Sequence, residues 1–425
     1  MIFSQRKLVD FLLLMLIGVL IIFSYDVQIQ ESNAYLGMKK IEYDYLYIVN
    51  LLISIVIIFL ILPDFSNTTP ANIFFGIYVI FPLLTLVFIY GASGFLNSYS
   101  YWALFIFQVL SISFIRFGIL LAKYIFYRVD LKVYLLSKYI KIEWIFVVFL
   151  VFTSFILLQK FEIDFDFVNS YERRLHVRGE ISGILAYMMS MGLNGVAPFL
   201  AYISALKKKF FLFIVALLFV VIGFGVAGVK APIVLVVLMW LYGKKHNTST
   251  STSILRILTW AILIILILSI LEFFIFNFSV GMDVVIRRVF ATVAQVQGYY
   301  GDFYLNYLTT NDVIFGLPGE GKDVTYIIGE LYFNNPSTNE NTNTFLYEIG
   351  RRGLMGYVFM LLFLSCFLAF LDVLYKKYKL KEMSAVSLLY SLIIIEQSYT
   401  VALITSGIFF VTVVVFLFSN NKVVR

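Results

Sequence analysis

The chain has 425 residues, of which 61% are hydrophobic and only 13% are charged, and its formal net charge is +7. A soluble globular domain carries about 25% charged residues, so this composition excludes an ordinary soluble fold. One cysteine and two histidines exclude a disulfide framework and a His-rich metal centre. The basic residues mostly flank apolar runs, where they orient helices in a membrane and do not indicate nucleic acid binding.

Repeated apolar runs of about 20 residues predict one all-α polytopic membrane domain over residues 1–425. The runs are continuous and do not alternate, which disfavours a β-barrel. Counting them predicts about twelve spans, in chain order at residues 8–25, 45–63, 73–95, 101–122, 143–158, 181–206, 210–228, 231–243, 254–277, 353–374, 384–400 and 402–419. Arg116, Glu272 and Glu396 lie within spans and need partners or an aqueous cavity there, and Arg116 is a candidate partner for either glutamate.

The distribution of Lys and Arg predicts the orientation of these spans. The basic clusters fall on one side of a twelve-span chain, and they lie at residues 6–7, 123–141, 207–209, 244–245, 376–381 and 422–425. This side is then the cytoplasm, with both termini inside. The loop at residues 64–72 is assigned to the same side although it contains no Lys or Arg.

Two polar stretches fall on the outer side: residues 159–180, here called the first polar loop, and residues 278–353, the second polar loop. Their arginines contribute nothing to a positive-inside orientation. Arginine forks bind phosphate oxygens bidentately, which predicts a phosphate or pyrophosphate clamp. The alternatives are contact with anionic lipid head groups, or a solvated face paired with Glu172 and Glu180. The candidate clamp residues are Arg173, Arg174, Arg178, Lys230, Arg287 and Arg288.

The second polar loop begins with a predicted amphipathic helix. Its polar stripe runs at helical spacing from Arg288 through Gln295 and Asp302 to Asn306, and its opposite face is apolar. We expect such a helix to lie in the membrane interface with its polar stripe facing a cleft. The loop ends at residues 341–356, where Asn and Thr side chains are predicted to cap the incoming helix and glycines allow close packing.

These residues resemble the O-antigen polymerases of the Wzy type, which join oligosaccharide repeat units. The resemblance covers residues 140–410. It rests on four motifs that follow one another in the order found in the family and that are all predicted on the same side of the membrane. Four segments match: Asn169-Ser-Tyr171 with Arg173, Arg174 and Arg178; Gly228-Val-Lys-Ala-Pro232; Arg287-Arg288 leading into Tyr299-Tyr-Gly-Asp-Phe303; and Asn341-Thr-Asn-Thr344 leading into Gly353-Leu-Met-Gly356.

The resemblance implies a metal-independent membrane glycosyltransferase of GT-C-like architecture, without a cofactor, in the bacterial inner membrane and with its active site facing the periplasm. Its substrate would be an undecaprenyl-pyrophosphate-linked oligosaccharide, and the growing glycan would pass to the non-reducing end of a new lipid-linked repeat unit. Membrane lipid is an implied partner, and a chain-length regulator protein is left open. The related O-antigen ligases carry a histidine ahead of the closing glycine pair, whereas this chain has Asn341-Thr-Asn343 there, which favours a polymerase.

The chemistry of glycosyl transfer from a pyrophosphate carrier suggests a role for each of these residues. Arginines and a lysine stabilise a pyrophosphate leaving group without a divalent ion. The acceptor hydroxyl needs a base or an orienting acceptor, for which the candidates in descending preference are Asp302, Glu348 and Glu172. The expected glycan contacts are Tyr299, Tyr300, Asn341 and Asn343, and an interfacial aromatic belt is the alternative for the two tyrosines. A lipid-linked oligosaccharide flippase is the main alternative, but two similar halves with short loops are expected of it, and this chain concentrates its polar residues in one late outer loop.

Overall fold

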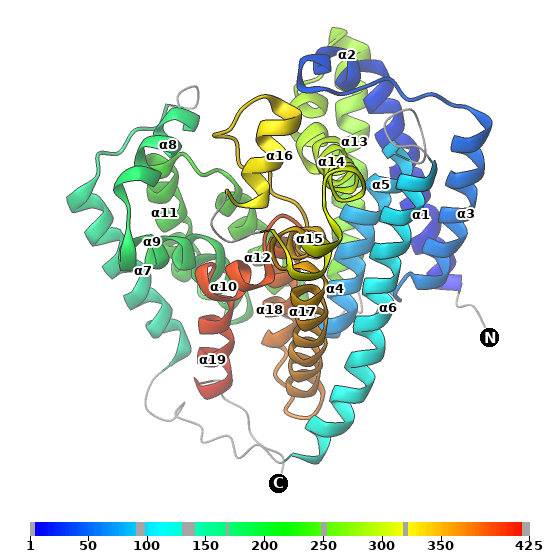
Figure 1. Ribbon diagram of the computed structural model, residues 1–425. Helices are drawn as coiled ribbons and strands as arrows, with labels where there is room; N and C mark the ends of the chain where they lie inside the picture. The colour runs from blue at the N-terminus through cyan, green and yellow to red at the C-terminus, as the bar shows by residue number, and fades with distance from the viewer. Residues whose placement is uncertain are drawn as a thin grey trace. The chain divides into compact units, whose positions relative to one another are not determined.

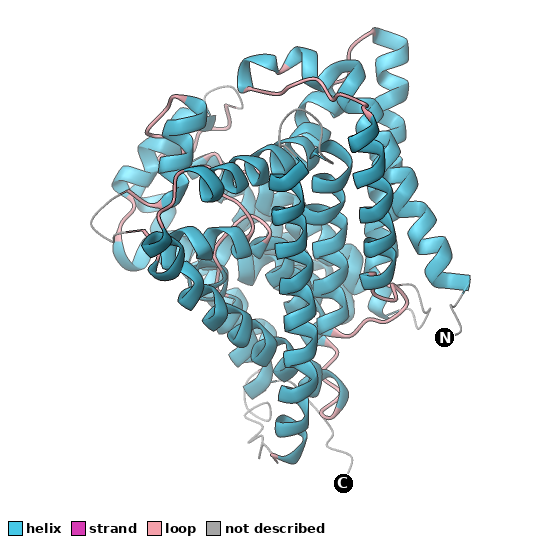
Figure 2. Ribbon diagram, turned by 45° about the vertical axis from the view of Figure 1, so that its right-hand side comes forward, coloured by secondary structure: helices cyan, strands magenta, loops and turns pink. Residues whose placement is uncertain are grey.

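The computed structural model of the protein describes residues 5–90, 98–129, 141–166, 170–247, 253–317 and 322–418. Every regular element within these ranges is a helix, as Figures 1 and 2 show, so the predicted all-α class is confirmed. In the described part of the chain, eight helices are long and apolar enough to cross a membrane, which indicates a membrane-embedded protein. The chain divides into two compact units, each described by itself below.

Unit 1 comprises Met1–Tyr124, Ser253–Ala369 and Ile394–Ser398. Its helices, with the last turns of α6 and α17 continuing into unit 2, are α1 (Gln5–Ser24), α2 (Gln30–Ser32), α3 (Tyr45–Ile61), α4 (Pro70–Tyr78), α5 (Leu84–Tyr90), α6 (Ser98–Arg128), α13 (Ile254–Phe276), α14 (Thr292–Asn306), α15 (Thr310–Phe315), α16 (Val324–Phe333) and α17 (Thr344–Lys376). Three π-helical turns interrupt or extend these helices: η1 (Tyr25–Ile29) joins α1 to α2, η3 (Val79–Leu83) joins α4 to α5, and η6 (Gly281–Ala291) leads into α14. A 3-10 turn, η2 (Ala34–Leu36), follows α2.

Unit 2 comprises Ile125–Thr252, Phe370–Ile393 and Tyr399–Arg425. Its helices are α7 (Ile142–Lys160), α8 (Ser170–Glu180), α9 (Gly183–Met191), α10 (Ala197–Leu206), α11 (Phe210–Ala227), α12 (Ala231–Asn247), α18 (Glu382–Ile394) and α19 (Ile408–Phe418). The π-helical turn η5 (Gly192–Val196) joins α9 to α10, and η7 (Val401–Thr405) precedes α19. Helix lies within each of the twelve predicted ranges, but residues 395–398 interrupt the range 384–400, and residues 91–95 and 419 lie outside the described part of the chain.

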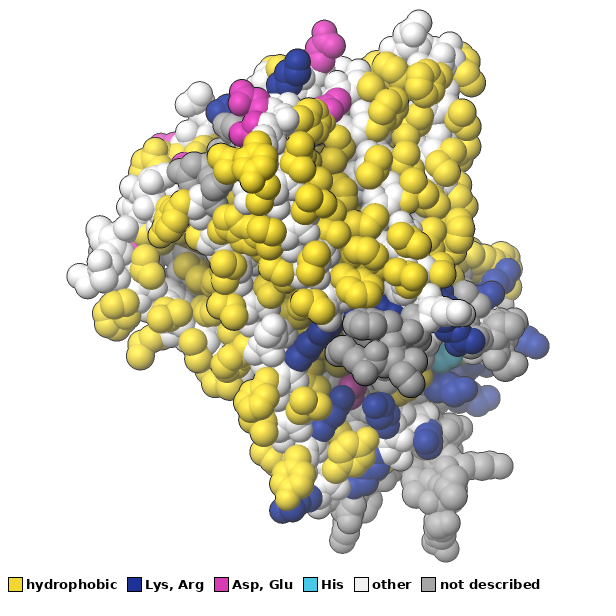
Figure 3. Space-filling view, turned by 90° about the vertical axis from the view of Figure 1, so that its right-hand side faces the viewer, with side chains coloured by type: hydrophobic (Ala, Val, Ile, Leu, Met, Phe, Trp, Pro, Cys, Tyr) yellow, Lys and Arg dark blue, Asp and Glu magenta, His cyan; other side chains and the backbone are white. Residues whose placement is uncertain are grey.

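The span formed by α4, η3 and α5 is the core of unit 1. In the most apolar 18-residue stretch of this span, 94% is buried inside the protein. In the corresponding stretches of the spans that contain α1 and α6, 39% is buried. Pro82 lies inside the span, and because proline cannot donate a backbone hydrogen bond, the helix widens there into the π turn η3. The helices around this core turn apolar faces outward: Leu60 and Phe117 are 59% and 62% exposed. Figure 3 shows one such face, dominated by hydrophobic side chains, which lipid would cover.

Local sequence explains where several helices begin and end. The hydroxyl of Ser253 accepts from the amide of Leu255 at the start of α13, and Thr309 and Asp312 form a reciprocal capping box at the start of α15. α13 and α16 both end at an asparagine in the left-handed conformation, Asn277 (φ 54°) and Asn334 (φ 51°). Asparagine tolerates this conformation better than other residues with a side chain, so both positions stop a helix cleanly.

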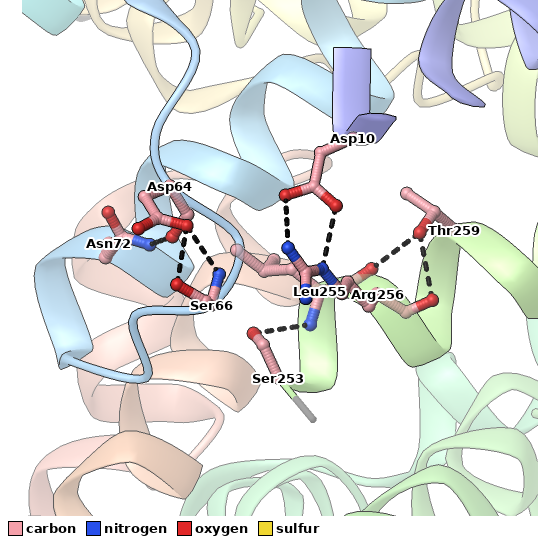
Figure 4. Close-up of polar contacts among 8 residues, drawn as sticks. All are labelled: Asp10, Asp64, Ser66, Asn72, Ser253, Leu255, Arg256 and Thr259. Atoms are coloured by element: carbon pink, nitrogen blue, oxygen red, sulfur yellow. Dashed lines mark hydrogen bonds and ion pairs between the residues drawn. The ribbon is translucent and has the colours of Figure 1, made fainter. Parts of the chain in front are cut away.

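A buried ion pair joins α1 and α13 near their first turns (Figure 4). Arg256 donates from Nε to Oδ1 of Asp10 over 2.7 Å and from a terminal nitrogen to Oδ2 over 2.9 Å. Figure 4 shows the loop that carries Asp64 and Ser66, with Asn72 at the start of α4, beside this pair. The starts of α1 and α13 and this loop therefore share one end of unit 1, as their assignment to one membrane side requires. Which side is the cytoplasm stays a prediction.

Removing one partner of this ion pair should destabilise the protein asymmetrically. Asp10 is 1% exposed and Arg256 is 22% exposed. Arg256→Leu leaves a buried carboxylate without a partner, so we expect a loss of about 2–3 kcal/mol, and Asp10→Asn should lose less because Arg256 reaches solvent. Thermal unfolding in detergent measures both, and the double variant should recover part of the loss. An Arg256→Leu protein as stable as Asp10→Asn would contradict this reading.

Candidate functional site

The predicted site residues are divided between the two units. The first polar loop and Lys230 belong to unit 2, and the second polar loop belongs to unit 1. The geometry within each unit is given separately.

Arg173 of α8 is used inside unit 2. Its side chain is 11% exposed, and one terminal nitrogen lies 2.7 Å from Oδ2 of Asp164. The other terminal nitrogen donates to the carbonyl oxygens of Asp166 and Phe224, over 3.2 and 3.4 Å. Arg173 therefore ties the start of the first polar loop to the end of α11. Gly228 (φ 66°) follows α11, and a Cβ there would collide with the carbonyl oxygen of Ser170, which explains the glycine in this motif.

The remaining predicted residues of unit 2 lie at its surface. Glu172, Arg174 and Lys230 are exposed. α8 carries Arg178 one turn after Arg174, but the side chain of Arg178 lies outside the described part of the structure. Arg174 and Lys230 are thus the accessible cations among the residues predicted here, and their role as a clamp stays a prediction.

The attachment made by Asp164 should weaken in acid. A hydrogen bond from the amide of Asp166, together with Arg173, holds the pKa of Asp164 below its ordinary value of 3.8. A carboxyl group whose pKa is lowered by folding contributes stability above its ordinary pKa and loses it as the pH falls through the lowered value. Between about pH 5 and about pH 3, amide hydrogen exchange at residues 161–166 should therefore accelerate beyond the intrinsic rate. In Asp164→Asn the exchange should be fast at both pH values; an unchanged profile in that variant would contradict the assignment.

α14 is packed between other helices and does not lie on the unit as a two-faced surface helix. Gln295, expected on the exposed polar stripe, is 1% exposed, and its amide donates to the carbonyl oxygen of Leu36 over 2.7 Å. Gln297 is also buried: its Oε1 accepts from Gln108 of α6 over 2.8 Å. The expected cleft-facing stripe is therefore wrong at Gln295. The physical reason is that the Gln295 amide is satisfied in the interior by the carbonyl oxygen of Leu36 and the hydroxyl of Tyr299.

Asp302 is oriented by two hydrogen bonds. Its Oδ1 accepts from Nδ2 of Asn306 over 2.7 Å, and its Oδ2 accepts from the hydroxyl of Tyr332 over 2.5 Å. Tyr332 belongs to α16, and its ring stacks on Tyr299 of α14 with centroids 4.4 Å apart and an interplanar angle of 14°. The structure thus links Asp302 to Tyr299 through a residue that sequence reasoning missed.

Tyr300, predicted as a glycan contact, is part of the core. Its side chain is 0% exposed, and its hydroxyl donates to the carbonyl oxygen of Glu340 over 2.9 Å. A ring in this position cannot meet a sugar at the surface, so this expectation is wrong for the structure described. Tyr299 and Tyr300 are adjacent on a helix, so their side chains point about 100° apart. The sequence did not show which of the two faces the core.

Asn343 caps α17, as predicted. Its Oδ1 accepts from the amides of Phe345 and Leu346 over 3.2 and 3.3 Å, and its side chain is 1% exposed. Its Nδ2 lies 3.4 Å from Oε1 of Gln297. Burial leaves Asn343 no surface for a glycan, whereas Asn341 is exposed.

Glu348 lies on α17 and is 0% exposed. Its Oε1 accepts from the hydroxyl of Ser398 over 2.8 Å, and its Oε2 accepts from Arg352 over 3.2 Å. Ser398 belongs to the short segment Ile394–Ser398, which the chain contributes to unit 1 between two parts of unit 2. Both oxygens of Glu348 are thus held inside the protein. No sequence spacing relates Ser398 to Glu348, so this partner was not predictable.

A second group of polar side chains links α16 to α17. Asp323 caps α16 and accepts from the hydroxyl of Tyr347 over 2.8 Å, and Arg351 donates to the same hydroxyl over 2.9 Å. The second polar loop is therefore a folded helical layer whose acidic and basic residues largely satisfy one another. Among the described residues, no three His, Cys, Asp or Glu side chains gather so as to hold a metal ion.

Arg287 and Arg288 differ although they are neighbours on η6. Arg287 is 15% exposed on its side chain, and its Nε donates to the carbonyl oxygen of Asp283 over 2.7 Å. Arg288 is exposed, and no acidic partner faces it in the described part of unit 1. Of the predicted clamp residues in unit 1, Arg288 is thus the one whose guanidinium is available to an anion.

Comparison with known proteins gives no assignment. No family model matches the chain, and no curated protein or solved structure matches it. The function is therefore inferred from the residues and their geometry.

Proposed function

We propose that the protein polymerises lipid-linked oligosaccharide repeat units at the outer face of a bacterial inner membrane. It transfers the growing glycan from undecaprenyl pyrophosphate to the non-reducing end of a new undecaprenyl-pyrophosphate-linked repeat. In this proposal about twelve spans form a metal-independent glycosyltransferase of GT-C-like architecture with both termini in the cytoplasm. Helix at each of the twelve predicted ranges supports that count.

The observation that carries the proposal is the folded second polar loop. A protein that only moved lipid-linked sugars would need short loops, whereas this chain builds a helical layer from η6 to the start of α17 and fixes it to unit 1 through buried amides. That layer presents an exposed arginine, Arg288, and an oriented carboxylate, Asp302. A guanidinium outside the spans, without an acidic partner among the described residues of unit 1, suits a pyrophosphate leaving group.

The helix also separates these two groups. η6 and α14 form one continuous helix, and Asp302 follows Arg288 by fourteen positions, which corresponds to about 20 Å along the axis. The acceptor hydroxyl attacks the same anomeric carbon whose bond to the pyrophosphate breaks, so two side chains this far apart cannot both act at that carbon. If Arg288 binds the pyrophosphate, Glu348 and Glu172 remain as candidate bases and Asp302 serves the glycan elsewhere.

The test is the polysaccharide banding pattern of a strain that lacks the gene. Loss of a polymerase leaves a single repeat unit on the lipid core, whereas loss of a flippase or of a ligase leaves none. We expect the deletion strain to carry a single repeat unit on the lipid core. The wild-type gene should restore the ladder, which is the series of gel bands from polymers of increasing length. A normal ladder in the deletion strain, or a core without any repeat, would overturn the proposal.

Conservative variants of the carboxylates then rank them as bases. Glu348→Gln can keep hydrogen bonds to Ser398 and Arg352, so it should remain folded. If Glu348 accepts the proton, the polymer yield of this variant should fall at least about a hundredfold. Glu172→Gln tests the exposed alternative in the same assay. Full polymer yield from both variants would exclude both residues as the base.

A further inference from the structure

We infer that the crossing of α14 and α16 is a carbohydrate subsite, formed by Asp302, Asn306, Tyr307 and Tyr332, that binds sugar residues of the glycan remote from its pyrophosphate end. The identity of the ligand rests on the proposed function, but the binding itself can be tested without it.

The polar half of this subsite is preorganised. Tyr332 and Asn306 each donate to one oxygen of Asp302, so the carboxylate is fixed in a single orientation. Each carboxylate oxygen retains a second acceptor position, and two such positions side by side fit a pair of neighbouring sugar hydroxyls. Burial and the hydrogen bond to Asp302 raise the pKa of Tyr332, so its phenol stays protonated and continues to donate.

The aromatic half is rigid. Tyr332 is half-buried and rests on Tyr299, whose hydroxyl accepts from Gln295 over 2.9 Å. Tyr307 is 58% exposed and stacks on Phe303, with centroids 5.9 Å apart and an interplanar angle of 18°. Rings held from beneath offer an apolar face at little further loss of conformational freedom, which favours binding of a rigid ligand such as a sugar ring.

An interfacial aromatic belt would explain the tyrosines alone. It does not explain why a carboxylate is held between an amide and a phenol at the same place, because an ionised group is disfavoured where rings sit among lipid chains. A polyhydroxylated ligand uses both features together. The subsite lies about 20 Å along the helix from Arg288, which places it several sugar residues away from a pyrophosphate bound at Arg288.

Titration of the full-length protein in lipid nanodiscs tests the subsite. The probe is the polysaccharide of the same cells, cut to oligosaccharides by mild acid, and calorimetry measures its affinity. Tyr332→Ala removes both ring and hydroxyl and should weaken binding at least about thirtyfold. Tyr332→Phe keeps the ring and should weaken it about fivefold. Asp302→Asn, which keeps the shape of the side chain, should weaken it about tenfold.

Controls separate this subsite from folding and from polymerisation. Tyr45→Ala removes a highly exposed tyrosine elsewhere in unit 1 and should bind as the wild type does. Arg288→Ala should also keep its affinity for the oligosaccharide, because the probe carries no pyrophosphate. The inference is overturned if the wild type does not bind the oligosaccharide, or if Tyr332→Ala and Asp302→Asn both bind it as tightly as Tyr45→Ala. A normal ladder in the deletion strain would instead overturn the proposed function and leave the binding result standing.

Discussion

Replacing Arg288 by alanine should abolish the polymer ladder while the single-repeat product persists. Arg288 is exposed and has no acidic partner in the described part of unit 1, so its removal leaves no buried charge and should not unfold the protein. Loss of one charge-assisted contact that forms with the leaving group reduces the rate by about 100- to 1,000-fold. Polymer length is measured on gels of extracted lipopolysaccharide, with the amount of membrane-inserted protein measured in parallel.

Lys322→Ala is a matched control for the arginine. Lys322 is also a cation of the second polar loop, 52% exposed, and it pairs with Glu330 over 2.7 Å. An exposed pair of this kind contributes about 0–1 kcal/mol, so the ladder should remain intact. Arg174→Ala, the corresponding change in unit 2, should lose the ladder as Arg288→Ala does. Full-length ladders from both arginine variants would exclude the pyrophosphate clamp.

Gly353→Ala should destabilise the protein by more than about 3 kcal/mol. At Gly353 the helix α17 breaks, with φ 63° and ψ −166°, a conformation that is nearly restricted to glycine. A Cβ at this position would also lie 2.5 Å from the carbonyl oxygen of Ile314 and collide with the amide of Gly316. Backbone atoms cannot move aside as a flexible side chain can. The fraction of protein that remains monodisperse after heating in detergent measures the loss.

Gly183→Ala separates conformational strain from collision. Gly183 has nearly the same φ, 62°, but nothing lies within 4 Å of a Cβ built there. This variant should therefore lose only about 1 kcal/mol, the cost of a left-handed residue with a side chain. Equal stability losses in the two variants would show that the contact between Gly353 and residues 314–316 is unimportant.

The sequence predicted the helices because a long apolar run in a membrane has one stable solution, the helix that satisfies its own backbone. It also predicted that residues 341–344 would cap α17, since capping depends on neighbours in the chain. It identified Gly353 as special, but assigned it to close packing. The reversal of φ that makes glycine necessary appears only once the backbone is traced.

Contacts between distant parts of the chain were beyond prediction. Arg116 was expected to pair with Glu272 or Glu396, yet it donates to the carbonyl oxygen of Ile61 and lies over the ring of Phe75 at 4.7 Å. Glu272 accepts instead from Ser279, over 2.6 Å. A charge within a span must find some partner, but which one depends on helix packing that hydropathy does not encode. The partners Tyr332 and Ser398 were missed for the same reason.

The amides of Gln108, Gln297 and Asn343 join α6, α14 and the start of α17 by hydrogen bonds within the core of unit 1. Amide side chains neither gain nor lose a proton across the physiological range. If the second polar loop faces the outside, as proposed, it meets changes in external pH, and anchoring by carboxylates or histidines would loosen as that pH changed. Attachment of the second polar loop through amides should therefore persist over a wide pH range while the ionised groups on its surface respond.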